Sequence, residues 1–142
     1  MMKHTILILF LFLSLLCHGQ SYKFFTTDRE LSSSLINKIY QDRNGMIWIA
    51  TEDGLNRYDG AKFITYKHDP ENEYSLCHNY VRVLYEDSKG RLFVGTYNGI
   101  QLYDPETDSF SARAQWEDGK TFDSNIMSIL ERRNGEIWVS GN

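Results

Sequence analysis

The chain has 142 residues, of which 42% are hydrophobic and 14% aromatic, and its formal net charge is -4. These apolar and aromatic fractions exclude a disordered chain. A mildly acidic chain whose Lys and Arg residues are not clustered offers no electrostatic surface for nucleic acid, so we expect this segment to contact none.

Residues 1–20 predict a signal peptide. Lys3 and His4 form a short polar start, and residues 6–17 are apolar apart from Ser14. This run has the length of a signal-peptide core and is short for a membrane span. We therefore expect export to the periplasm with cleavage near the end of the leader, the alternative being an uncleaved membrane anchor.

The exported part keeps one cysteine, Cys77, because Cys17 lies in the leader. A single thiol cannot form an internal disulfide, so stability must come from packing. We expect Cys77 to be a small buried apolar residue rather than a reactive site.

The first strand candidate after the leader is the aromatic segment 22–25, which in a closed ring could pair with the last unit. Three similar runs follow at 36–41, 81–86 and 126–131. Each run carries apolar residues on both alternating faces, which predicts strands that are covered on both sides.

Each run leads through a short turn into further strand candidates rich in β-branched and aromatic residues. Glycine in these turns supplies the positive φ that a tight hairpin needs. The second strands are expected at 46–50, 92–95 and 137–140, the third at 55–58 and 100–103, and weaker fourth strands at 62–66 and 109–111.

The turn glycines Gly45, Gly90 and Gly135 are spaced 45 residues apart, twice in succession. Four short antiparallel strands in each repeat of this length are typical of a β-propeller blade. A helical repeat is excluded, because each unit carries several Gly, Asn and Asp turns and no helical period. The sequence predicts an all-β protein with four-stranded antiparallel propeller blades in an incomplete ring. The domains are a signal peptide at 1–20 and a partial propeller at 21–142, with blades at about 31–75, 76–120 and 121–142, the last incomplete.

Several residue types recur at fixed places in the repeat, and we interpret them as structural. The aromatic column could stack on sugars, but its constant strand position favours core packing. The aspartates could suggest calcium, but Asx-type bonding to backbone N–H groups explains them better. A small-residue column (Ala50, Gly95, Ser140) suits a place where strands crowd. The recurring residues are Asp42, Gly45, Trp48, Thr51, Gly54, Tyr58, Asp87, Gly90, Phe93, Thr96, Gly99, Tyr103, Gly135 and Trp138.

The pattern Asp-x-x-Gly-x-hydrophobic-Trp/Phe, continued by Ala/Gly-Thr-x-x-Gly and closed by Tyr-Asp, spans 42–59 and 87–104. It resembles the two-component regulator propeller repeat, and the chain resembles the start of a hybrid two-component sensor histidine kinase. The resemblance implies a periplasmic propeller that detects carbohydrates, followed by a membrane span and a kinase. The third copy departs from the pattern at Arg132 and Gly141. Because the repeat stops within a blade, we interpret the chain as a truncated sensor or its amino-terminal fragment.

No residue pattern nominates a catalytic group, a cofactor or a metal. His68 and His78 with Cys77 could suggest a metal site, but such a site would want more ligands at tighter spacing. The long polar connections 68–79 and 113–123 are where binding usually resides on a rigid scaffold. By chemistry alone, the candidate ligand-binding loop residues are Arg57, Tyr97, Asn98 and Trp116.

We therefore expect a non-enzymatic, amino-terminal fragment of a ligand-sensing propeller, with an oligosaccharide as the ligand. Its other partners would be the remaining blades and a second copy in a homodimer, within a parent protein anchored in the inner membrane. One alternative is an exported propeller enzyme, a lyase or hydrolase, and another is a propeller scaffold that binds a protein. Residues 21–142 alone are expected to aggregate readily, because unclosed blades expose strand edges.

Overall fold

The computed structural model describes residues 22–27, 30–115 and 119–142, and every regular element in this part of the chain is a β-strand. The strands form three antiparallel sheets in simple sequential order, which confirms the predicted all-β blade architecture. Blade 1 holds β1 (Ile36–Gln41), β2 (Ile47–Thr51), β3 (Gly54–Tyr58) and β4 (Phe63–Tyr66). Blade 2 holds β5 (Val81–Glu86), β6 (Leu92–Thr96), β7 (Gly99–Asp104) and β8 (Ser109–Phe110). Blade 3 holds β9 (Ile126–Glu131) and β10 (Ile137–Gly141).

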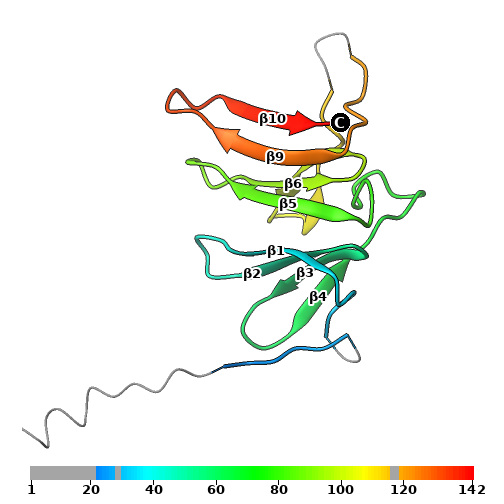
Figure 1. Cartoon of the computed structure of the whole chain (residues 1–142), viewed down its shortest axis with the longest axis vertical. Helices are drawn as coiled ribbons and strands as arrows, with labels where there is room; N and C mark the ends of the chain where they lie inside the picture. Colours follow the sequence, from blue (N-terminus) through cyan, green and yellow to red (C-terminus); the bar gives the residue numbers. More distant parts are fainter. Residues whose placement is uncertain (1–21, 28–29, 116–118) are drawn as a thin grey trace, which may run out of the picture.

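The three sheets stack face to face, from blade 1 through blade 2 to blade 3 (Figure 1). The first strands of the blades lie next to one another, with β5 in contact with both β1 and β9. The described residues contain no helix of the length and apolar character that a membrane span requires. The predicted signal peptide at 1–20 lies outside the described residues.

The hairpins that open each blade have the same local geometry. Gly45, Gly90 and Gly135 have φ of 84°, 82° and 85°, which is the left-handed region where glycine is favoured. In the first two copies an aspartate carboxylate closes the turn. Asp42 accepts the backbone N–H groups of Asn44 and Met46, and Asp87 accepts those of Lys89 and Arg91. The aspartates thus satisfy turn N–H groups that no strand pairing reaches.

Stacking produces one hydrophobic core between each pair of sheets. The core between blades 1 and 2 contains Trp48, which is only 1% exposed, with Leu55, Leu84 and Phe110 around it. A second core lies between blades 2 and 3 and is centred on Ile126. Burial of apolar surface between blades is therefore the main favourable contribution to this fold.

Two expectations about strands were wrong. Segment 22–25 is not a strand, and the Phe25 ring instead packs on Tyr58 and Phe63 at centroid distances of 5.1 Å and 4.9 Å. Cover on both sides does not hold for β1, where Ile39 is exposed. Trp138 is also 58% exposed although Trp48, at the same place in the repeat, is buried. Ile39 and Trp138 are exposed for the same reason. A blade face is covered only by a neighbouring sheet, and none of the described residues forms a sheet over these two faces.

Candidate functional site

The turns β2–β3 and β6–β7 meet the long connections between blades at one end of the sheets, which we name the loop face. The Gly54 N–H donates to the carbonyl of Asn79 at 2.7 Å, and the equivalent Gly99 N–H donates to that of Ser124 at 2.9 Å. Each turn is therefore fixed to the connection that enters the next blade. The side chains of these turns and connections are presented together on the loop face.

A groove of about 550 Å³ opens on the loop face, and we name it the aromatic groove. Tyr97 lines it, and the residue surface of Tyr97 is 55% exposed although it lies within a fixed turn. The Tyr97 ring lies 5.6 Å from the ring of His78 and 6.1 Å from that of Tyr80, measured between centroids. The groove is lined by His78, Tyr97, Asn98, Asp123, Asn125 and Asn142.

The buried Thr96 hydroxyl holds the turn that carries Tyr97 and Asn98. Thr96 Oγ1 accepts the Asn98 N–H and donates to the Gly99 carbonyl, both at 3.1 Å. Thr51 makes the same pair of bonds in blade 1, to Asp53 and Gly54. The side chain at the first turn position therefore projects from a rigid support, and at Tyr97 that side chain is an exposed aromatic ring.

The polar lining of the aromatic groove is also oriented. Asp123 forms an ion pair with Arg113 at 2.6 Å, and the Asn125 amide donates to the Asn142 side chain at 3.0 Å. His78 Nδ1 accepts the backbone N–H of Tyr80 at 2.9 Å, which leaves the hydrogen on Nε2 of the neutral ring. Burial, together with the nearby His68, lowers the pKa of His78. The groove therefore presents a neutral imidazole, three amides and one paired carboxylate beside Tyr97.

Of the four predicted ligand residues, the structure brings Tyr97 and Asn98 together in the aromatic groove. Trp116 lies outside the described residues. Arg57 is not a loop residue, which corrects the expectation: it lies on β3 and points into the interface of blades 1 and 2. Its guanidinium donates to Asp108 at 2.7 Å and to the hydroxyl of Tyr103.

The surroundings of Arg57 explain why it is held away from the loop face. The guanidinium carbon lies 5.6 to 5.8 Å from the ring centroids of Trp48, Tyr66 and Tyr103. The hydroxyls of both tyrosines also donate to the Asp108 carboxylate. Burial, and then the hydrogen bond to Asp108, raise the pKa of Tyr103 to about 12. This cage of rings around a cation connects the outer strands of two blades.

Sequence reasoning did not nominate His78, Asp123 or Asn125 as ligand residues. The 45-residue period contains the signal that would have found them, because His78 and Asp123 occupy the same place in successive repeats. Asn125 likewise corresponds to Tyr80. Superposing the repeats therefore identifies the residues that approach the Tyr97 turn.

The histidine and cysteine that suggested a metal site have other bonds. His68 Nδ1 lies 2.6 Å from the Leu76 carbonyl oxygen, and Cys77 Sγ lies 3.1 Å from Thr96 Oγ1. Burial raises the pKa of the Cys77 thiol, which disfavours the reactive thiolate. In the described ranges, no three His, Cys, Asp or Glu side chains gather as a metal site would require.

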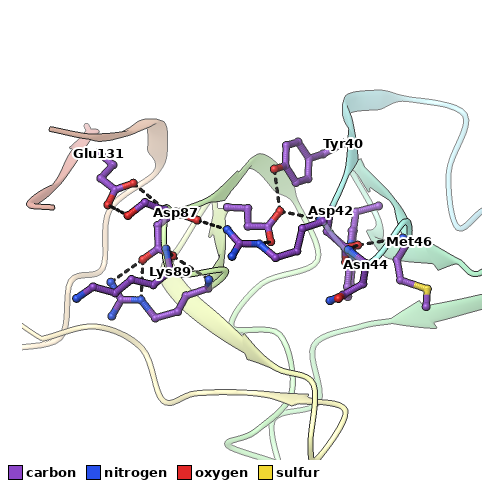
Figure 2. A network of polar contacts seen from close by, with 12 residues as sticks. Tyr40, Asp42, Asn44, Met46, Asp87, Lys89 and Glu131 are labelled. Carbon is purple, nitrogen blue, oxygen red and sulfur yellow. Dashed lines mark hydrogen bonds and ion pairs between the residues drawn. The ribbon is translucent and has the colours of Figure 1, made fainter. Parts of the chain in front are cut away.

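The opposite end of the sheets carries a polar network that joins the blades (Figure 2). Arg43 pairs with Glu86 at 2.6 Å and also donates to the Asp87 carbonyl at 2.8 Å. One repeat later, Ser88 donates through its backbone N–H and its hydroxyl to Glu131, at 2.8 Å and 2.6 Å. These side chains are engaged in contacts between sheets, so the loop face is the better candidate for binding a ligand.

The stacked antiparallel blades define a segment of a β-propeller. Residues 30–53 and 75–98 match the family model described as "Two component regulator propeller". Two segments of the chain thus match the two-component regulator propeller repeat.

Relatives of this chain occur among two-component signalling proteins. It is 40% identical to histidine kinase P4 of Formosa agariphila over 73 residues, which are 49% of this chain and 5% of that protein. It resembles the extracellular domain of the hybrid two component system BT3049 from B. thetaiotaomicron, at 29% identity and a TM-score of 0.70. That likeness covers 82% of this chain and 17% of the other. The extracellular domain of BT4673 from the same organism, at 24% identity, shares the fold, with a TM-score of 0.68 over 87% of this chain and 18% of its own.

The chain therefore spans only a small part of each of these proteins. Its homology to extracellular domains of hybrid two-component systems supports a sensor propeller.

Proposed function

We propose that this chain forms the first blades of a periplasmic sensor propeller that binds a carbohydrate in the aromatic groove. The parent protein would be a histidine kinase anchored in the inner membrane. The observation that carries the proposal is the exposed Tyr97 ring on a rigid turn, with oriented polar side chains beside it. The predicted signal peptide and the homology to extracellular domains support a periplasmic location.

The chemistry of the groove fits a sugar. The face of an aromatic ring offers a large apolar surface on which the C–H face of a sugar ring can pack. Asn98 and Asn125 provide amide donors and acceptors for ring hydroxyls, and Asp123 provides an acceptor. The lining is mostly polar, as a ligand with many hydroxyl groups requires, and Tyr97 supplies its apolar ring face.

The groove acts in this proposal as a binding site and not as a catalytic one. Its carboxylate, Asp123, is paired with Arg113, and its imidazole, His78, already accepts a backbone N–H at Nδ1. To transmit a signal, the bound sugar must interact more favourably with one arrangement of the sensor dimer than with another. The ligand would thereby shift the population of that arrangement across the membrane-anchored pair.

Calorimetric titration with a glycan panel tests the proposal, using the protein expressed from its complete reading frame. Tyr97→Ala is expected to weaken binding by about tenfold or more, which corresponds to about 1.4 kcal/mol or more. Tyr74→Ala is the matched control, because Tyr74 is likewise 55% exposed but does not line the groove. Absence of binding to every glycan, or equal effects of the two substitutions, would contradict the proposal.

A further inference from the structure

A second cavity lies beside the aromatic groove on the loop face, and we name it the rim cavity. Its volume is about 330 Å³, within the range of small-molecule sites. It is lined by residues of the connections that enter blades 2 and 3, including Asn72, Glu73, Ser75 and Arg113, and by Gln101 of β7. The contacts described so far give this cavity no role.

The two cavities share a wall. Arg113 lines the rim cavity, Asp123 lines the aromatic groove, and the two side chains form the ion pair of 2.6 Å. The consecutive residues Cys77 and His78 also face one cavity each. Both members of the ion pair are partly exposed, and an exposed pair of this kind contributes little stability. A ligand that crosses from one cavity to the other can therefore exchange hydrogen bonds with this pair at small cost.

The rim cavity has a fixed polar floor. Gln101 is buried, its amide nitrogen donates to the carbonyls of Ser75 and Ser111 at 3.0 Å and 2.8 Å, and its amide oxygen accepts the Cys77 N–H at 2.7 Å. The equivalent residue of blade 1, Asn56, makes the same kind of bond with the backbone N–H of Ser32. The floor is thus part of the repeat architecture and does not have to form when a ligand arrives.

The walls of the rim cavity carry both signs of charge. Among the described lining residues, Arg113 carries a positive charge and Asp69 and Glu73 carry negative charges, so the excess is a single negative charge. Of the described residues that line it, His68 is the only aromatic one, whereas Tyr97 lines the aromatic groove. The rim cavity therefore suits a neutral unit that makes hydrogen bonds, and the groove suits a unit that packs on a ring.

We propose that the aromatic groove and the rim cavity are two subsites of one extended site for a neutral oligosaccharide of at least two sugar units. This inference rests on the proposed function, because it assumes that a sugar occupies the groove. One unit packs on Tyr97, and the next unit passes the Arg113–Asp123 pair into the rim cavity. Once the first unit is bound, the second binds at high effective concentration, so affinity rises with chain length.

The test compares monosaccharides with the matching neutral tetrasaccharides (glucose with cellotetraose, mannose with mannotetraose, xylose with xylotetraose) by calorimetry on the protein from its complete reading frame. The tetrasaccharide is expected to bind at least about tenfold more tightly than its monosaccharide. Glu73→Trp, which fills the rim cavity, is expected to remove that advantage and leave monosaccharide affinity unchanged. Glu71→Trp is the control, because Glu71 is an exposed residue of the same connection that does not line the cavity.

The outcomes separate the two proposals. If monosaccharide and tetrasaccharide bind equally well, or if Glu73→Trp and Glu71→Trp behave alike, the second subsite is refuted while the groove proposal stands. Tighter binding of acidic tetrasaccharides such as oligogalacturonate would refute the preference for a neutral ligand. If no sugar binds to the unsubstituted protein, both proposals fail.

Discussion

Gly95 is the position where the stacking of blades is most sensitive to one added methyl group. It pairs with Val83 across β5 and β6, and it faces Ile126 at the start of β9. A Cβ atom on Gly95 would lie 2.5 Å from Val83 Cγ1 and 2.7 Å from Ile126 Cγ2, far below the 3.4 Å at which ordinary contact begins. Both neighbours are β-branched and have few alternative rotamers, so they cannot easily move aside.

Gly95→Ala is therefore expected to destabilise the protein. Overpacking of this kind costs about 1–3 kcal/mol, and the lower backbone entropy of Ala offsets about 0.5–1 kcal/mol of it. These ranges leave a net loss of about 0–2.5 kcal/mol in the free energy of unfolding, with a central value of about 1 kcal/mol and a fall in Tm of several degrees. The sign is informative, because at an uncrowded strand position the same substitution would stabilise.

Urea unfolding followed by tryptophan fluorescence measures this difference in the protein expressed from its complete reading frame. Glu106→Ala is the control, because Glu106 is an exposed residue of the turn between β7 and β8 and belongs to neither core between blades, so its effect should stay within about 0.5 kcal/mol. A Gly95→Ala protein more stable than the parent would refute the crowded packing of β5, β6 and β9.

Two further predictions concern the interactions that join and close the blades. Arg57→Met should lower the free energy of unfolding by about 1–3 kcal/mol, because it removes the charged donor to Asp108. Lys62→Met, which replaces an exposed cation, is the control and should have little effect in the same urea assay. Equal effects of the two substitutions would contradict the role of the cage around Arg57. Asp87 is desolvated by burial, which raises its pKa, but the backbone and side chain of Arg91 bond to it and bring the net pKa below the ordinary value. A carboxyl group with a lowered folded-state pKa contributes stability above its unfolded pKa of about 3.9, and that stability is lost as pH falls through the folded pKa. Asp87→Asn should therefore flatten the dependence of stability on pH below about pH 4, and an unchanged acid-unfolding profile would show that Asp87 does not contribute.

The strands and turns were predictable because the same residue pattern occurs in successive repeats. Turn glycines such as Gly45 and Gly90 recur with the same neighbours, and each copy reinforces the reading of the other. The small column at Gly95 indicated crowding, although only the structure shows that the close atoms belong to Val83 and Ile126. The residue pattern within each repeat was thus enough to predict the strands and turns of the blades.

The candidate site was harder to predict, because its contacts join distant parts of the chain. Arg57 looked like a loop cation, but its ion-pair partner Asp108 lies 51 residues further along and in another blade. Tyr97 was nominated for its exposed chemistry, whereas His78 and Asp123 approach it only through the stacking of connections on the loop face. The exposure of Trp138 depends on what covers its sheet, which its position in the repeat does not determine.

The assignment to a sensor is tested most directly by reading the gene beyond the codon for Asn142. Our account predicts further repeats spaced by about 45 residues, then a membrane span and a histidine kinase domain. A frame that ends at that codon, or that continues into an unrelated domain without a kinase, would contradict the sensor assignment.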